Sequence, residues 1–406
     1  WLPPSWALLV GLFGLAMVLG TYWTNSYWGG ALNASAGALV AGSAGVLRKR
    51  PSTAHLTLFA LGAVLCAITR PYEGTVLVSL FSTWLVWSIL RQGRPAIMAH
   101  LRRCLPPLLL LAACGSAFLY YNFRVTGKPL TMPYNVAAKR YLASRMFLFQ
   151  KHPPVPEYRH PVMRDIYVGL RRSEQAPHWR LHENFTSFRL IYLSTVLFPF
   201  FVFSICSIFP PRRRKLRPPI LIAFGGLAAI LALPWINPHY YAPFATCFLI
   251  AVVASLRGLR ALPFAGRRPG WILSVLAVAL LTAQIVQAYE REAAPRPQPR
   301  LFWAAQRAAM LKQLASEGER HLIVVRYSPE HNWYNEWVYN QADIDGSPVV
   351  WAREMNPARD AELLRYFSSR KAWLLEADAV PPRLVPHPGA NPTPLPRPMS
   401  EPARQR

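Results

Sequence analysis

Long apolar runs without a charged residue recur along this chain, and they restrict its possible folds more than any other feature. Two of them, LTLFALGAVLCAI (56–68) and TVLVSLFSTWLVWSIL (75–90), are separated only by the residues TRPYEG. Runs of roughly 16–22 apolar residues have about the length that a helix needs to cross a bilayer. Since 52% of the 406 residues are apolar and only 16% are charged, we predict a polytopic α-helical membrane protein.

We expect about nine transmembrane helices, five within residues 1–121 and four within 188–288. The chain opens with Trp1 inside an apolar pattern, so we also expect it to be part of a longer protein. The apolar runs place the helices at approximately 5–22, 29–47, 56–69, 75–90, 105–121, 188–209, 218–234, 241–256 and 271–288.

Positive charge is concentrated on one set of the short loops between these runs. Loops 48–50, 91–104, 210–219 and 257–270 together hold 16 basic and no acidic residues. The opposite short loops hold a single basic residue, Arg70. Such an asymmetry follows the positive-inside rule. It accounts for most of the net charge of +26 without a nucleic-acid partner. The rule predicts that residue 1 is cytoplasmic and that the C-terminus is external.

The second predicted helix has an unusual composition, GGALNASAGALVAGSAGVL. Small residues such as Gly37, Ala41 and Gly45 let helix backbones approach closely. This pattern favours a tightly packed interior helix over a ligand-binding one.

Residues 122–187 form a polar stretch with a net charge of +7, which we place outside the membrane. The segments KRYLASRMFLFQKHPP and DIYVGLRR have apolar residues at helical spacing. They predict short helices on the membrane surface. A solvated loop is an equal alternative, because long loops escape the positive-inside rule.

The C-terminal region differs in composition and alternates between helical and strand-like patterns. After a Pro-rich linker at 289–299, residues 300–380 are predicted to form an external α/β domain with a mostly parallel sheet, followed by a disordered tail at 381–406. The predicted elements are a helix at 300–317, strands at 321–327 and 348–353, a helix at 358–369 and a strand at 372–378.

Ionisable residues near the predicted helices gather at their external ends. Charged groups at membrane depth are costly and usually face a protein interior or a cavity, so these residues are the candidate binding groups. Arg70 could bind a lipid phosphate, with Glu73 orienting it; a structural Arg70–Glu73 ion pair is an equal alternative. The candidate phosphate- or substrate-binding residues are Asn25, Arg70, Tyr72, Glu73, Lys128, Lys139, Arg140, His239 and Tyr240.

Motifs for metals, disulfides and nucleophiles are weak. The five cysteines all fall within or at the ends of apolar segments and suggest no disulfide framework. The segment HNWYNEWVYNQADID gathers His331, Glu336, Asp343 and Asp345, which could bind a cation or a sugar. A solvated loop is the more common outcome for such a segment, so we predict no metal site.

Several segments together resemble a group of bacterial membrane proteins, the GT-C type glycosyltransferases, which include aminoarabinose and protein mannosyl transferases. The similar segments are TYWTNSYWGGALNASAGALV, RPYEG, NPHYYAPF and RYSPEHNWYNEWVYNQADIDGSPVVWAR. The resemblance implies a bacterial inner-membrane enzyme that moves a sugar from a polyprenyl-phosphate donor to a glycan, lipid or protein acceptor on the periplasmic face.

The resemblance also sets limits on the site. In this class a catalytic Asp, or an Asp/Glu pair, lies in the first external loop, which we expect upstream of residue 1. No catalytic residue can therefore be assigned, and we expect this chain alone to be inactive. A divalent cation is a possible cofactor of the class.

Two other functions compete with this one. A flippase or transporter of a lipid-linked glycan predicts polar residues at the bilayer midplane and an internal repeat, and the sequence has neither. A non-enzymatic membrane scaffold predicts that the polar external ends are scattered over separate faces.

Overall fold

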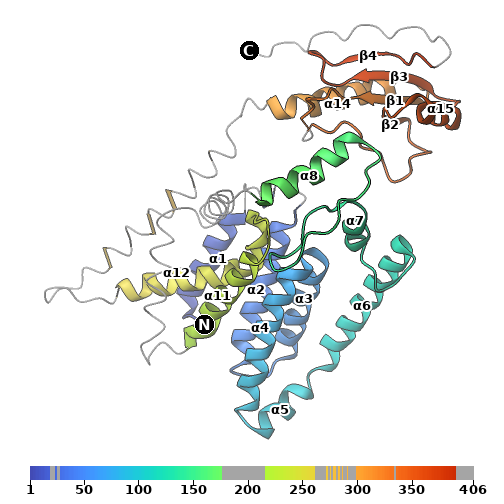
Figure 1. Ribbon diagram of the computed structural model, residues 1–406. Helices are drawn as coiled ribbons and strands as arrows, with labels where there is room; N and C mark the ends of the chain where they lie inside the picture. The colour runs from blue at the N-terminus through green and yellow to red at the C-terminus, as the bar shows by residue number, and fades with distance from the viewer. Residues whose placement is uncertain are drawn as a thin grey trace. The chain divides into compact units, whose positions relative to one another are not determined.

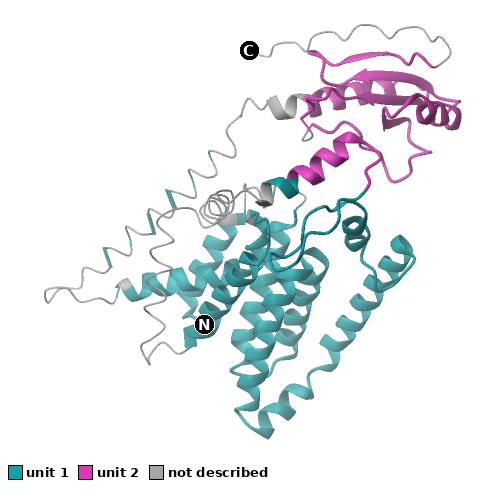
Figure 2. Cartoon of the chain, viewed as in Figure 1, with its two compact units in different colours: residues 1–156, 170–294 teal, residues 157–169, 295–406 magenta. Residues whose placement is uncertain are grey.

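The chain folds into two compact units (Figure 2), one formed by residues 1–156 with 170–294 and one by residues 157–169 with 295–406. The computed structural model describes residues 1–18, 23–24, 28–175, 215–260, 299–332 and 335–389, with isolated positions between 271 and 290. The chain is mostly helical, and its small sheet lies in the second unit (Figure 1).

Unit 1 is built from apolar helices joined by short connections. α8 (Pro161–Gln175) contributes residues to both units. The other helices that the structure describes in unit 1 are α1 (Pro4–Val18), α2 (Gly30–Leu47), α3 (Thr53–Thr69), α4 (Pro71–Leu90), α5 (Arg94–Leu101), α6 (Leu105–Thr126), α7 (Pro133–Tyr141), α11 (Arg217–Leu231), the 3₁₀ turns η2 (Pro238–Tyr240) and η3 (Ala242–Phe244), and α12 (Ala245–Arg260).

Within the described residues, α2, α4 and α6 are long and apolar enough to cross a membrane. The predicted count of nine is not supported. α3 has 17 residues, which span about 26 Å at the helical rise, somewhat less than the ~30 Å hydrocarbon core. α1, α11 and the segment Ala242–Gly258 are also apolar but shorter than a full span. The helices expected at 188–209 and 271–288 lie outside the continuously described residues.

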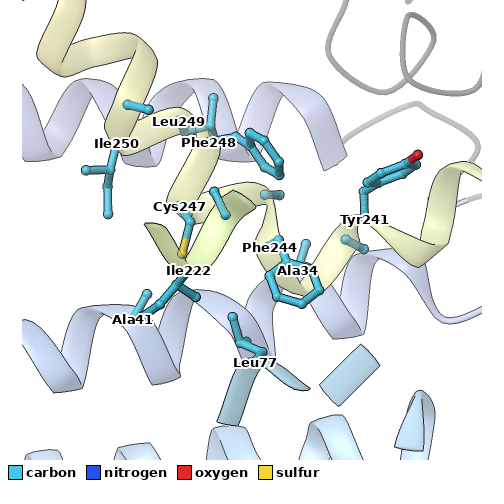
Figure 3. Packing of buried hydrophobic residues seen from close by; sticks show 14 of the residues in the cluster. Ala34, Ala41, Leu77, Ile222, Tyr241, Phe244, Cys247, Phe248, Leu249 and Ile250 are labelled. Carbon is cyan, nitrogen blue, oxygen red and sulfur yellow. The ribbon is translucent and has the colours of Figure 1, made fainter. Parts of the chain in front are cut away.

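The small-residue helix α2 is buried inside unit 1, as its composition predicts. A Cβ added at Gly37 would lie 1.9 Å from the Pro243 carbonyl oxygen, and one added at Gly45 would lie 2.8 Å from the Trp1 indole nitrogen. Around it, Ala34, Ala41, Leu77, Ile222 and Phe244 form one buried cluster that joins α2 to α4, α11 and η3 (Figure 3). Close backbone approach is the physical reason for the glycines.

The predicted turn between the third and fourth helices is much tighter than expected. α3 ends at Thr69 and α4 begins at Pro71, so Arg70 alone separates them. Proline is favoured at the first position of a helix because it lacks an N–H that would be unpaired there. Glu73 therefore lies in the first turn of α4 and not in a loop.

Two short helices occur in the polar stretch that follows α6. α7 and α8 occupy 133–141 and 161–175. DIYVGLRR lies in α8, as predicted, but the helix predicted over KRYLASRMFLFQKHPP (139–154) is wrong, because only residues 139–141 are helical, at the end of α7. Its last residues, from 176, lie outside the described part of the chain.

Unit 2 contains a four-stranded sheet with the strand order β2-β1-β3-β4. β1 (His321–Arg326) is parallel to both β2 (Val349–Arg353) and β3 (Lys371–Glu376), and β4 (Arg383–Pro386) is antiparallel to β3. The mostly parallel sheet agrees with the sequence prediction.

Both faces of this sheet are covered by helices. On one face, Met310 and Leu314 of α14 (Pro299–Ala315) pack against Ile323 and Trp373. On the other, Leu363 of α15 (Pro357–Tyr366) packs in a second buried cluster. A parallel sheet buried on two faces requires continuous apolar strands, which is why HLIVV and AWLL lack the alternation of a half-exposed strand.

The prediction of a disordered tail from 381 is wrong for residues 383–386, which form β4. The segment RLVP adds to the free edge of β3, with Val385 opposite Leu374. Its proline occupies an edge strand, where it is tolerated. Residues 390–406 and most of the linker at 289–299 lie outside the described residues.

Candidate functional site

Arg70 is the centre of the candidate site in unit 1. Its side chain is only 17% exposed, and its guanidinium lies 4.4 Å from the ring centroid of Tyr240. This cation–π contact joins the α3–α4 junction to the η2 turn. Pro71 fixes the backbone next to Arg70 at the start of α4. The guanidinium is thus positioned both by the α3–α4 junction and by Tyr240 of η2.

Glu73 is the nearest acidic partner of Arg70, but the two groups are not hydrogen-bonded. The Arg70 Nη1 to Glu73 Oε1 distance is 3.7 Å, beyond hydrogen-bond length. Glu73 is 4% exposed and lies at the N-terminus of α4, where the helix dipole favours a negative charge. Among the residues that the structure describes, none accepts a hydrogen bond from the Arg70 guanidinium.

His239 extends the site on the side of Tyr240. Its ring stacks on Trp28 with the centroids 5.3 Å apart and meets Tyr240 edge-on at 4.8 Å. Burial, and then the positive charge of Arg70, lower the pKa of His239 to about 3. The imidazole is therefore neutral at physiological pH and adds no charge beside Arg70.

Two further tyrosines, Tyr72 and Tyr134, lie in this part of unit 1. Tyr72 donates its hydroxyl hydrogen to the Ala229 carbonyl at 2.9 Å and packs edge-on against Phe147, so it supports the site structurally. Partial burial and Tyr240 raise the pKa of the Tyr134 phenol, Arg70 lowers it, and Glu73 raises it. Tyr134 of α7 therefore lies within the electrostatic field of the Arg70 cluster. It was not among the site residues predicted from the sequence.

The remaining predicted site residues are not brought into the cluster. Lys128 is exposed in the connection after α6, and Lys139 and Arg140 are exposed on α7; no described contact joins them to Arg70. Arg140 instead lies 5.6 Å from the ring centroid of Tyr141. Asn25 lies outside the described residues.

An apolar cavity of about 500 Å³ lies between α1, α2 and α12. Its walls include small residues that leave room between the helices, such as Gly11, Gly14 and Ala38. Ser35 and Thr246 are the hydroxyl-bearing residues of its lining. The glycine spacing in α1 was a signal for this space, but it becomes meaningful only when the three helices are known to meet.

The N-terminal end of α2 connects the cavity with the Arg70 cluster. Trp23 lines the cavity, and a Cβ added at Gly30 would lie 2.8 Å from its ring. One added at Gly29 would lie 2.4 Å from the Thr69 side chain, the residue before Arg70. Gly29 has φ +71°, a conformation that glycine adopts without strain. A residue of the cavity lining and the residue that precedes Arg70 thus each pack against one member of this glycine pair.

This arrangement combines a cationic, donor-rich group with an adjacent apolar space. It suits an amphiphilic anion, with its charged group at Arg70 and its apolar part between the helices. Among the described residues no group of three His, Cys, Asp or Glu side chains could hold a metal ion.

Comparisons with protein families, with curated proteins and with solved structures find no match to this chain.

Proposed function

We propose that the chain is part of a membrane glycosyltransferase that takes a polyprenyl-phosphate-linked sugar and transfers the sugar to a glycan, lipid or protein acceptor on the periplasmic side of a bacterial inner membrane. The observation that carries this proposal is Arg70: a mostly buried guanidinium, held over Tyr240, whose donors meet no described acceptor. A phosphate would satisfy those donors with the two-pronged geometry that guanidinium favours.

The surroundings of Arg70 support a lipid-linked phosphate over a free one. The apolar cavity beside α2 would accept part of a polyprenyl chain, because burial of CH₂ groups contributes about 0.8 kcal/mol each. Neutral His239 and the aromatic rings of Trp28 and Tyr240 would lie near the headgroup. The nine-helix arrangement and the periplasmic placement of unit 2 belong to the same proposal.

The convergence of Arg70, Tyr240, His239 and Trp28 favours this function over a passive scaffold, which does not require such a cluster.

Binding of a polyprenyl phosphate to the chain in nanodiscs tests the proposal, with the uncharged polyprenol as a second ligand. Arg70→Ala should weaken polyprenyl phosphate binding about 10- to 100-fold, since a hydrogen bond to a charged group contributes about 1.5–3 kcal/mol. It should leave polyprenol binding unchanged. Arg91→Ala is the matched control, because Arg91 also lies over an aromatic ring, that of Trp87 at 4.0 Å, at the opposite end of α4.

The cavity is tested by Ala38→Leu, which narrows the space beside α2 and should weaken both ligands. Ala113→Leu, at an exposed position of α6, controls for added bulk. Equal binding of polyprenyl phosphate by the wild type and Arg70→Ala would exclude the phosphate role. In membranes with the complete enzyme, Arg70→Ala should also lower the consumption of lipid-linked sugar.

A further inference from the structure

The connection between β1 and β2 in unit 2 is unusually long for a compact domain. It covers residues 327–348, and its described part contains neither helix nor strand. Connections longer than roughly 12–15 residues without regular structure are uncommon and often functional. From its sequence, this segment could be a cation site, a sugar site or, more commonly, a solvated loop.

The connection begins where an open parallel sheet usually binds ligands. β1 lies between β2 and β3, and the chain leaves β1 toward β2 but leaves β3 toward β4. Neighbouring parallel strands whose connections run in opposite directions create a crevice outside their carboxyl ends. Ser328 and His331 follow β1, and Asp378 follows β3, at this edge.

A histidine–aspartate pair bridges the two strand ends. His331 Nδ1 lies 2.7 Å from Asp378 Oδ1, and Asp378 Oδ2 accepts a hydrogen bond from the Ser328 backbone N–H at 2.8 Å. Since a carboxylate only accepts, the shared proton belongs to Nδ1, and Nε2 is an acceptor in the tautomer that carries this single proton. The ring centroids of His331 and Tyr327 are 3.9 Å apart. Asp378 and Tyr327 therefore both fix the orientation of the His331 ring.

The acceptor nitrogen of this pair is buried without a partner. The His331 side chain is 2% exposed, and no group in the described chain hydrogen-bonds to Nε2. Two further polar atoms, the Arg353 Nε donor and the Asn335 Oδ1 acceptor, are also buried without a hydrogen-bond partner in the described chain. A buried polar atom without a partner lowers stability, and a suitable ligand would recover that loss.

His331 and Arg353 belong to one neighbourhood, built around Tyr327 and Glu336. Arg353 donates to Glu336 at 2.5 Å, and Tyr327, under the His331 ring, donates to the same carboxylate at 2.6 Å. His160 packs edge-on against Tyr327. Burial lowers the pKa of His160, and the charges of Arg353, Glu336 and His331 also act on it.

Glu336, Asp343 and Asp345, the acidic residues that the sequence suggests for a cation, are already engaged, which argues against a cation. Burial acts to raise the pKa of Glu336, but hydrogen bonds from Arg353, Tyr327 and the Val338 N–H outweigh it and hold the pKa below its ordinary value. Asp343 accepts from the Gly346 N–H, and Asp345 from the Tyr366 hydroxyl. No metal-binding group of three occurs in the described part of the chain.

An anion fits the region no better. Glu336 neutralises Arg353, and Asp378 places a negative charge against His331. The unpartnered atoms are one donor and two acceptors, and a hydroxyl group can supply both roles.

We propose that the carboxyl edge of the unit 2 sheet binds a neutral carbohydrate, with His331 Nε2 accepting a hydrogen bond from a sugar hydroxyl and Arg353 Nε donating to another sugar oxygen. Since Nε2 is buried, the sugar reaches it through a local movement of the β1–β2 connection. This site is separate from the Arg70 cluster and does not depend on the function proposed for unit 1.

Saturation-transfer NMR on the full chain tests the proposal, in a zwitterionic, sugar-free detergent so that detergent sugars cannot compete. The probes are the methyl glycosides of glucose, mannose, arabinose and N-acetylglucosamine. At least one should bind the wild type, and inorganic phosphate and Ca²⁺ should not displace it. His331→Phe, which keeps a ring but removes the acceptor, should lower its affinity at least tenfold.

Asp378→Asn is the sharper variant, because it preserves the shape of the side chain and moves the ring proton of His331 from Nδ1 to Nε2. The asparagine oxygen can still accept from the Ser328 N–H, and its NH₂ group then donates to His331 Nδ1. The ring proton moves to Nε2, which becomes a donor. Glycoside binding should fall at least tenfold, while ¹⁵N shifts of His331 report the changed tautomer.

Two controls separate this site from its surroundings. Asp345→Asn lies in the same connection but contacts Tyr366, and it should bind as the wild type does. Arg70→Ala should also leave glycoside binding unchanged, even if it abolishes polyprenyl phosphate binding. The proposal is wrong if none of the four glycosides binds the wild type at millimolar concentration, if His331→Phe and Asp378→Asn bind like the wild type, or if phosphate or Ca²⁺ competes.

Discussion

At the scale of single residues, unit 1 places its polar groups where their charges offset one another. Glu73 is buried and is stabilised by the α4 N-terminus and by Arg70 at 3.7 Å. That separation is long enough to leave the guanidinium donors available. From the sequence, a structural ion pair and a phosphate site are equal alternatives for Arg70. The geometry is compatible with both, since the ion pair does not use up the donors.

His239 should make unit 1 sensitive to mild acid. Its pKa is about 3 in the folded chain and about 6.5 when unfolded, so the unfolded state binds more protons between these values. The stability contributed by the neutral ring is complete above pH 6.5 and is lost as the pH falls toward 3. At pH 5 the loss should be about 2 kcal/mol.

Thermal unfolding in detergent at pH 7 and pH 5 measures this effect. His239→Gln removes the titrating ring, so its unfolding temperature should fall less between the two pH values than that of the wild type. His55→Gln, in the first turn of α3, controls for the loss of a histidine elsewhere. An equal fall in the wild type and His239→Gln would show that other groups cause the acid sensitivity.

At the scale of elements, α2 depends on one very close contact. Gly37 meets the Pro243 backbone, and an alanine there would place its Cβ 1.9 Å from the carbonyl oxygen. Backbone cannot move aside as a flexible side chain does, so Gly37→Ala should lower stability by about 1–3 kcal/mol, as overpacking does. Gly42→Ala is the matched control in the same helix, with nothing within 4 Å of its Cβ.

Unfolding temperatures of the two variants decide the point. Gly42→Ala should be neutral or stabilising by up to about 1 kcal/mol, because alanine is the better helix former. If Gly37→Ala were equally benign, α2 and η3 could not be packed as the structure has them.

The local sequence pattern predicted the helices and strands better than it predicted their ends and their contacts. The small residues of α2 and the apolar strands β1 and β3 are visible in the sequence because burial imposes a composition on them. The end of α3 at Thr69 was predicted correctly, but the start of the fourth helix was expected at 75, whereas α4 begins at Pro71. β4 was missed because its four residues form a strand only beside the edge of β3.

The candidate site shows the same division. The sequence placed Arg70 and His239 at one level, as ionisable residues at helix ends. It could not pair His331 with Asp378, which are 47 positions apart, or show that α1, α2 and α12 enclose a cavity. Such contacts depend on strand order and helix packing, which no local spacing encodes.

At the scale of the whole molecule, the described part of unit 1 separates its polar groups between two ends. The basic loops 48–50 and 91–104 meet at one end, where Gln92 donates to the Arg48 carbonyl at 3.1 Å and His100 Nε2 lies 3.1 Å from the Leu47 carbonyl oxygen. Arg70 and Tyr240 meet where α3 and α4 join. The charge asymmetry of the loops is therefore also a spatial asymmetry, as a membrane orientation requires.

This separation predicts which side of the membrane each end faces. With the five native cysteines replaced, a cysteine at Arg94 should react with an impermeant maleimide only after the cells are opened, whereas a cysteine at Lys128 should react in intact cells. Only α6 crosses between these two positions, since α5 is too short to span. The result therefore does not depend on how many helices the whole chain has.

A third cysteine at Val380, which is 95% exposed, extends the test to unit 2. Labelling in intact cells would place the unit on the side of Lys128 and require an even number of crossings between the two positions. That placement would give the sheet access to periplasmic sugars. Reaction at Arg94 but not at Lys128 in intact cells would invert the orientation, and the periplasmic placement of the Arg70 cluster would fail with it.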